Sequence, residues 1–150
     1  MNVLVVGSGG REHALAWALA RSSRAPRIFA LPGNPGMARL GSLLAGDPVD
    51  AGRILDAVRE RAIDLVVIGP ELPLVAGIAD RLASAGVRVF GPRAAAARIE
   101  GSKIFAKELM RRAGVPTASF HIAEEAVAGK KLAETLPLPL VVKADGLAAG

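Results

Sequence analysis

The fold is decided near the start of the chain by the stretch Val3-Leu4-Val5-Val6-Gly7-Ser8-Gly9-Gly10. Four consecutive apolar residues are typical of a strand in a parallel sheet that is covered on both faces. The glycines that follow end this strand, and the pattern predicts a helix from about Arg11 to Ser22. Strand, tight turn and helix in this order indicate the repeating unit of a parallel α/β sheet.

The same alternation continues through residue 91. Further strands are predicted at 27–31, 65–68 and 87–90, and helices from an N-cap at Asp50 and along the apolar stripe Leu74, Ile78 and Leu82. Glycine stands at the strand ends, so the sequence predicts an α/β domain with a doubly wound, mostly parallel sheet. Ligands of such sheets bind at the carboxyl ends of the strands.

The pattern changes near residue 100, where we place a domain boundary. The first domain then covers residues 1–101, and the second covers residues 102–150. In the second domain Ser102 is a predicted N-cap, with helices expected at 103–113 and 124–136 and strands at 118–122 and 140–142.

The composition narrows the class of protein. Of the 150 residues 51% are hydrophobic, the net charge is +5 and there is no cysteine, so neither disulfides nor cysteine-bound metals are expected. Basic and acidic residues are interleaved and aromatic residues are few, which disfavours a nucleic-acid surface. No apolar run approaches the ~20 residues of a membrane span, and the N-terminus lacks a basic leader. We therefore expect a cytoplasmic protein that acts on small molecules.

The loop Gly7–Gly10 is a candidate anion site, because a glycine loop presents free backbone N–H groups at a helix N-terminus. It does not fit a dinucleotide fingerprint, since Glu12 stands at the third glycine position and no acidic residue ends the second strand. A sugar phosphate or similar small anion is therefore favoured over NAD, although a tight turn without a ligand is the alternative. The two histidines, His13 and His121, have no second ligand at metal-binding spacing.

Two further loops are expected at the same edge of the sheet. Residues 32–36 carry Asn34, and residues 69–73 carry Glu71. Both polar side chains follow strand ends and could face a common ligand, while ordinary turn chemistry is the alternative.

Two lysines of the second domain indicate phosphate chemistry. Lys143 follows an apolar run and precedes a loop of glycines and alanines, where bare backbone and a cation can approach phosphate oxygens. Lys103 lies in the first turn of a helix, a position that the helix dipole disfavours unless an anion is near. A solvated basic helix face is the alternative for Lys103.

Six segments together resemble the glycinamide ribonucleotide synthetase (phosphoribosylamine–glycine ligase) family. They are Gly-Gly-Arg-Glu-His-Ala-Leu at 9–15, Pro-Gly-Asn at 32–34, Gly-Pro-Glu at 69–71 with Pro-Leu at 73–74, Gly-Ser-Lys at 101–103, Val-Pro-Thr-Ala at 115–118, and Lys-Ala-Asp-Gly-Leu-Ala-Ala-Gly at 143–150. They occur in the family's order along the whole chain.

The resemblance implies a Rossmann-like domain followed by the beginning of an ATP-grasp domain. It implies a purine-pathway enzyme that joins glycine to 5-phosphoribosylamine through glycyl phosphate, using ATP and Mg²⁺. The substrate-binding residues that it implies are Gly9, Gly10, Arg11, Glu12, Asn34 and Glu71. The ATP-binding residues that it implies are Lys103, Lys143, Asp145, Gly146 and Gly150.

The chain departs from the family pattern at two positions and in its length. Pro35 replaces a usual alanine, and Phe120 replaces a common tyrosine. The resemblance implies that the metal ligands and catalytic groups lie beyond residue 150, so the chain alone is expected to lack ligase activity. The alternatives are another ATP-grasp carboxylate–amine ligase, a biotin-dependent carboxylase subunit, or a stand-alone nucleotide-binding regulatory module.

Overall fold

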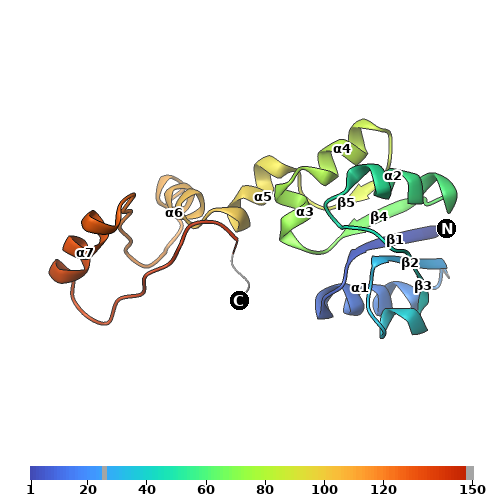
Figure 1. The fold of residues 1–150 in the computed structure, drawn as a ribbon, viewed down its shortest axis with the longest axis horizontal. Coiled ribbons are helices and arrows are strands. Elements are labelled where there is room, and N and C mark those ends of the chain that lie inside the picture. The colour runs from blue at the N-terminus through green and yellow to red at the C-terminus, as the bar shows by residue number, and fades with distance from the viewer. Residues whose placement is uncertain (25–26, 148–150) are drawn as a thin grey trace. The chain divides into compact units, whose positions relative to one another are not determined.

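A computed structural model describes residues 1–24 and 27–147 of the chain (Figure 1). The chain divides into two compact units, of which the first is Met1–Ala97 and the second begins at Arg98. Each unit is described by itself below.

The first unit is built on a five-stranded sheet in which every pairing is parallel. The spatial order is β3-β2-β1-β4-β5, and the strands are β1 (Asn2–Gly7), β2 (Arg27–Pro32), β3 (Gly41–Leu43), β4 (Leu65–Ile68) and β5 (Val89–Phe90). β1 lies at the centre, and the chain winds outward from it first to one side and then to the other. The doubly wound parallel α/β fold predicted from the sequence is confirmed.

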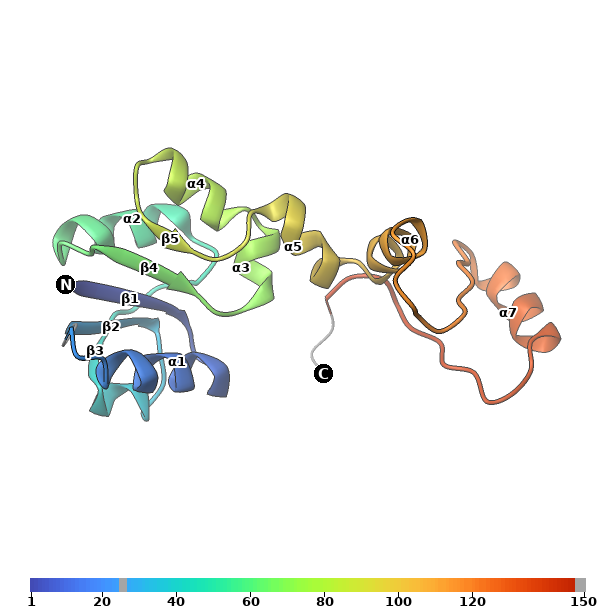
Figure 2. The same ribbon diagram turned by 180° about the vertical axis from the view of Figure 1, so that it is seen from behind.

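Helices cover both faces of this sheet (Figure 2). α1 (Gly10–Ala20) and the short 3₁₀ helix η1 (Met37–Arg39) pack on one face, and α2 (Ala51–Glu60), α3 (Glu71–Val75) and α4 (Ile78–Ser84) pack on the other. Val3 and Val5 of β1 belong to the core under α1, whereas Leu4 and Val6 belong to the opposite core. This double burial explains why the central strand is apolar without alternation.

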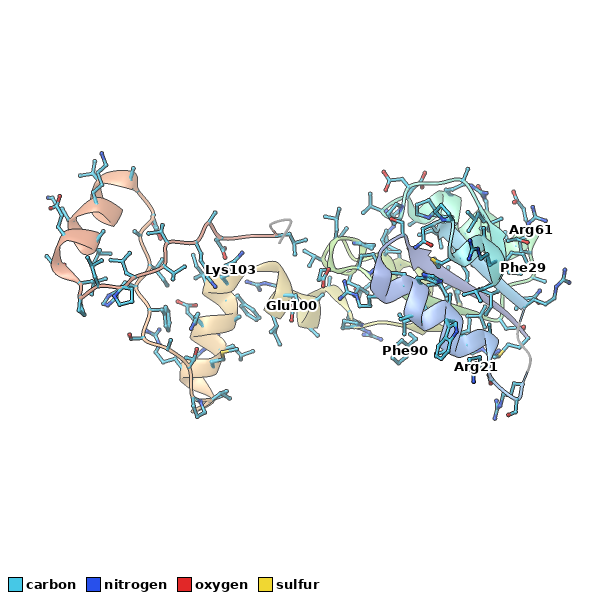
Figure 3. All side chains as sticks on the ribbon, turned by 90° about the horizontal axis from the view of Figure 1, so that it is seen from below. Arg21, Phe29, Arg61, Phe90, Glu100 and Lys103 are labelled. Atoms are coloured by element: carbon cyan, nitrogen blue, oxygen red, sulfur yellow. The ribbon has the colours of Figure 1, made fainter. Side chains whose placement is uncertain are left out.

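The edge of the sheet is less covered than its centre. Phe29 on β2 is buried in the larger core, whereas Phe90 on the edge strand β5 is mostly exposed (Figure 3). The edge strand β3 pairs so closely with β2 that a Cβ at Gly41 would overlap the carbonyl oxygen of Ile28. Neither η1 nor β3 was predicted, because such short elements carry too few residues for a periodic pattern.

The predicted N-cap at Asp50 is confirmed, but the helix predicted along Leu74, Ile78 and Leu82 is interrupted. Asp50 caps α2 by accepting a hydrogen bond from the Arg53 amide at 3.0 Å, as predicted. The apolar stripe from Leu74 to Leu82 does not form one helix, because Gly77 adopts a left-handed conformation with φ 78° that separates α3 from α4. Glycine adopts this conformation without steric cost.

The second unit is helical in its described part. α5 (Ala94–Gly101) leads into it, and α6 (Lys103–Arg112) and α7 (Ala126–Thr135) follow. Ser102 is the N-cap of α6, since its hydroxyl accepts a hydrogen bond from the Phe105 amide at 3.1 Å. None of the helices in residues 1–24 and 27–147 is long and apolar enough to cross a membrane.

The prediction of strands at 118–122 and 140–142 is wrong. Neither segment forms a strand, and Val141 and Val142 are 78% and 84% exposed. An apolar run becomes a strand only when a neighbour satisfies its backbone N–H and carbonyl groups. The described residues of the second unit contain no strand to serve as that neighbour.

The core position Ile54 gives a direct test of this architecture. Its side chain is fully buried between α2 and the sheet, so Ile54→Ala should lower the free energy of unfolding by about 2–5 kcal/mol. Arg59→Ala, at an exposed position of the same helix, should change it by less than about 1 kcal/mol. Urea denaturation followed by circular dichroism measures both, and equal effects would contradict the packing of α2.

Candidate functional site

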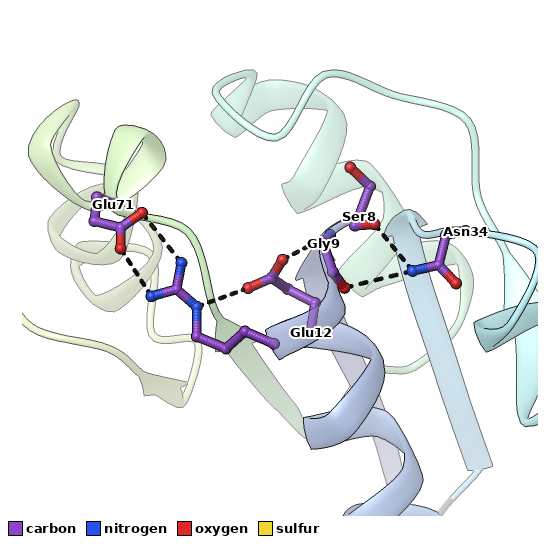
Figure 4. A network of polar contacts seen from close by, with 6 residues as sticks. Ser8, Gly9, Glu12, Asn34 and Glu71 are labelled. Carbon is purple, nitrogen blue, oxygen red and sulfur yellow. Dashed lines mark hydrogen bonds and ion pairs between the residues drawn. The ribbon is translucent and has the colours of Figure 1, made fainter. Parts of the chain in front are cut away.

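Three loops meet at the carboxyl edge of the sheet in the first unit. They follow β1, β2 and β4, which are neighbours in the sheet. The loops bring Gly9, Arg11, Asn34 and Glu71 into one polar network together with Glu12 (Figure 4). Gly10 begins α1 beside them.

Glu12 is the anchor of this network. It is only 3% exposed and is the one buried charged side chain in the described part of the chain. Its Oε2 accepts a hydrogen bond from the Gly9 amide at 2.8 Å, and its Oε1 accepts one from Arg11 Nε at 3.2 Å. A glutamate at the third helical position that bonds back to the N-cap amide satisfies a donor that the helix leaves free.

Glycines surround the Glu12 side chain. A Cβ at Gly9 would lie 2.7 Å from Glu12 Oε2, and one at Gly7 would lie 2.6 Å from Glu12 Cγ. A Cβ at Gly69, at the end of the adjacent strand β4, would overlap the Glu12 carboxylate. These glycines therefore make room for the Glu12 side chain. The Gly9 amide, which the sequence pattern predicted to be free for an external anion, instead donates to Glu12.

Arg11 extends the network to the surface. Its two terminal nitrogens donate to the two carboxylate oxygens of Glu71 at 2.8 and 3.1 Å, which is a bidentate ion pair. The side chains of Arg11 and Glu71 are 56% and 36% exposed. The hydrogen bonds to Arg11 lower the pKa of Glu71, and those to Glu71 raise the pKa of Arg11 further, so both groups are held in their charged forms.

Asn34 joins the loop after β2 to the glycine loop. Its side-chain amide donates to the carbonyl oxygens of Ser8 at 2.9 Å and Gly9 at 3.4 Å, while its Oδ1 accepts from the Met37 amide at 3.0 Å. Asn34 thus acts as a clamp between two strand ends. Behind it, a Cβ at Gly36 would overlap the His13 imidazole, so His13 packs on this loop and is not free on the helix surface.

The charges of this edge limit what it can bind. One guanidinium lies between two carboxylates, so the network of Arg11, Glu12 and Glu71 carries a net charge of about −1 when all three are ionised. The carboxylate oxygens of the half-buried Glu71 accept from Arg11 and retain lone pairs that can accept hydrogen bonds from hydroxyl or amine groups. Within the described residues there is no cluster of three or more His, Cys, Asp or Glu side chains that could hold a metal ion.

The second unit brings together several of the residues expected at a nucleotide site. Lys103 Nζ donates to the carbonyl oxygen of Gly146 at 2.7 Å. Asp145 accepts hydrogen bonds from the Ile104 amide and the Ser102 hydroxyl, and the Ile104 amide is the main cause of its lowered pKa. Lys143 is exposed on the same segment, and Gly150 lies outside the described residues.

Sequence reasoning selected Arg11, Glu12, Asn34 and Glu71 but missed how they interact. The pairing of Arg11 with Glu71 joins residues that are 60 positions apart. Gly69 was missed as a partner of Glu12. A glycine at the end of a neighbouring parallel strand was the available signal, because a buried side chain between two strand ends leaves no space for a Cβ.

The architecture defines the class of protein. The first unit is a doubly wound parallel domain, and residues 101–150 match the model of an ATP-grasp domain, so the chain is part of an ATP-grasp ligase. The chain belongs to the phosphoribosylglycinamide synthetase family: residues 1–100 match the model of its N domain, and residues 101–150 match the model of its ATP-grasp (A) domain.

Curated relatives align with the chain over its whole length. It is 50% identical over 150 residues to a phosphoribosylamine–glycine ligase of Mesorhizobium japonicum and 49% identical to one of Agrobacterium fabrum. The chain spans only 35% and 36% of the lengths of these two relatives. The crystal structure of phosphoribosylamine–glycine ligase from Thermotoga maritima superposes with a TM-score of 0.74 at 33% identity, covering 98% of this chain and 34% of that one.

A more distant likeness concerns the fold alone. The biotin carboxylase domain of a 2-oxoglutarate carboxylase from Hydrogenobacter thermophilus superposes with a TM-score of 0.69 at 22% identity. That structure contains magnesium ADP and bicarbonate. This similarity shows that the two proteins share a fold.

The fit of Glu12 against Gly69 can be tested by adding a methyl group. Gly69→Ala should lower the free energy of unfolding by about 1–3 kcal/mol, because the new Cβ must displace the Glu12 carboxylate. Gly10→Ala is the matched control, since a Cβ there meets nothing within 4 Å and should be neutral or stabilising. Denaturant titration of both variants gives the comparison, and a harmless Gly69→Ala would contradict the described packing.

The ion pair makes a prediction about pH. Because Arg11 lowers the pKa of Glu71 below its ordinary value of 4.5, the pair stabilises the fold above that pH and loses its effect as the pH falls through the lowered pKa. Arg11→Ala should return the Glu71 pKa toward 4.5. A ¹³C carboxyl titration by NMR measures the midpoint, and an unchanged midpoint would mean that Arg11 does not pair with Glu71 in solution.

Proposed function

We propose that this chain is the front part of a phosphoribosylamine–glycine ligase. The complete enzyme would join the carboxyl group of glycine to the amine of 5-phosphoribosylamine, giving glycinamide ribonucleotide, ADP and phosphate. The carboxyl group would be activated as glycyl phosphate before the amine attacks it.

The observation that carries this proposal is the identity of about 50% along the entire chain to phosphoribosylamine–glycine ligases. The family models for both the N domain and the ATP-grasp domain support it. Because the chain spans about a third of the length of these relatives, we expect no turnover by the 150 residues alone.

The first unit is proposed to bind phosphoribosylamine at the carboxyl edge of its sheet. Glu71 would accept hydrogen bonds from ligand hydroxyls, and Arg11 would hold its carboxylate in a fixed plane. Gly9, Gly10 and Asn34 would shape the loop beside the ligand. Glu12 would contribute from beneath, because it is buried and its two oxygens bond to Gly9 and Arg11.

The second unit is proposed to supply part of the ATP site. Lys103 and Lys143 would provide positive charge to the phosphates, and the segment with Asp145 and Gly146 would begin the loop that covers them. Transfer of a phosphoryl group depends more on cations and N–H donors than on a side-chain nucleophile. Gly150 is proposed for the same loop, outside the described residues.

The described residues do not account for the metal ion of the proposed reaction. The reaction of the family uses Mg²⁺, but the described residues offer no cluster that fits this ion, so we assign it no ligand here. The proposed substrates are small molecules, and the proposed place of action is the cytoplasm, with no role for nucleic acid or membrane.

Replacement of Glu71 tests this function. In the complete ligase that carries this chain, Glu71→Ala should reduce kcat/KM for phosphoribosylamine about 10- to 100-fold, as expected for the loss of charged hydrogen bonds to a ligand. The KM for ATP should stay unchanged. Asp56→Ala, an exposed carboxylate on α2, is the control.

The assay follows ADP release as each substrate is varied. ADP release that requires neither glycine nor phosphoribosylamine would contradict the proposed function. A normal reaction with an unimpaired Glu71→Ala variant would instead leave the function standing and remove Glu71 from the substrate site.

A further inference from the structure

We propose that Asp145 and Ser102 are positioning residues of the nucleotide site, which clasp the lysine-bearing segment 143–147 to the start of α6. The proposal rests on the proposed function, because it concerns the ATP side of that enzyme. It assigns Asp145 a task within the protein, in place of a direct contact with ATP.

The clasp consists of hydrogen bonds between two parts of the second unit that are far apart in sequence. Asp145 Oδ1 accepts from the Ile104 amide at 3.1 Å, and the Ser102 hydroxyl lies 3.2 Å from Oδ1 and 3.0 Å from Oδ2. These contacts join residues 41 and 43 positions apart. The Ser102 hydroxyl also accepts from the Phe105 amide, so it serves as both the helix cap and the link.

The charge of Asp145 resolves the unusual place of Lys103. α6 has no acidic residue of its own in its first turn, and Lys103 in that turn is disfavoured by the helix dipole. Asp145 supplies the missing negative charge from another segment. The sequence pattern predicted an anion near Lys103, and the carboxylate of Asp145 provides this negative charge from within the chain.

A second contact fixes Lys103 against the same segment. Its ammonium donates to the Gly146 carbonyl at 2.7 Å, one residue beyond Asp145. The two hydrogen bonds join consecutive residues on each segment, since Ser102 bonds to Asp145 and Lys103 bonds to Gly146. Lys143 precedes Asp145 by two residues, so the clasp holds the segment that carries Lys143 against the start of the helix that carries Lys103.

This arrangement gives the clasp a role in nucleotide binding. Two lysines that must face the same phosphates lose less conformational freedom on binding when the segments that carry them are already joined. Removal of the clasp should therefore weaken ATP binding while leaving the glycine site and the chemical step unaffected.

The kinetic test compares substrates in the complete ligase. Asp145→Ala should raise the KM for ATP about tenfold, with the KM for glycine unchanged and kcat at saturating ATP within about twofold of the unmodified enzyme. Ser102→Ala should act in the same direction, and Ser102→Thr, which keeps the hydroxyl, should restore the ATP affinity. Glu134→Ala, an exposed carboxylate of α7, is the control for charge.

A structural readout on the 150-residue chain tests the clasp without ATP. The Ile104 amide signal in ¹⁵N NMR spectra should titrate with Asp145, at a midpoint below the ordinary aspartate pKa of 3.8, because the Ile104 N–H bond favours the ionised carboxylate. Besides Asp145, the charged groups on segment 143–147 and in the first turn of α6 are Lys143 and Lys103. Ser102→Ala should move this midpoint upward.

The outcomes separate the two proposals. An Ile104 amide that does not follow Asp145, or an Asp145→Ala enzyme with normal ATP affinity, would overturn the positioning role while the ligase function stands. If the unmodified complete enzyme forms no ADP from ATP in the presence of glycine and phosphoribosylamine, both the proposed ligase function and the positioning role of Asp145 are overturned.

Discussion

The buried carboxylate of Glu12 is the constraint on which the carboxyl edge of the sheet depends. A charged group with 3% exposure must have its hydrogen-bonding capacity met, and the Gly9 amide and Arg11 meet it. The space for this side chain exists only because positions 7, 9 and 69 are glycines. One side chain therefore explains the glycine pattern of two neighbouring strand ends and the start of α1.

The same carboxylate gives the site its electrostatic character. From Glu12 the polar contacts pass through Arg11 to Glu71, from the interior to a side chain that solvent and ligands can reach. A Rossmann-like loop with free amides attracts phosphate, whereas in this loop the Gly9 amide donates to the carboxylate of Glu12. A ligand that brings hydroxyl or amine donors to Glu71 suits this edge, in agreement with the ribosylamine part of the proposed substrate.

Both units satisfy a helix N-terminus with a carboxylate of the chain, but they do so over different distances. In α1 the group comes from Glu12, three residues after the N-cap, and in α6 it comes from Asp145, 41 residues after the Ile104 amide that it accepts from. The first could be anticipated from the sequence because the capping-box spacing is local. The second could not, because no spacing rule connects a serine N-cap to an aspartate in a distant loop.

The sequence by itself determined the elements whose signals are local: the apolar central strand, the glycine turns, and the caps at Asp50 and Ser102. Tertiary structure alone decided the order of the strands, the pairing of Arg11 with Glu71 and the burial of Glu12. It also decided that the apolar run at 140–142 is not a strand. The physical reason is that backbone pairing and ion pairing need a partner from elsewhere in the chain, and a sequence pattern describes only one side of each contact.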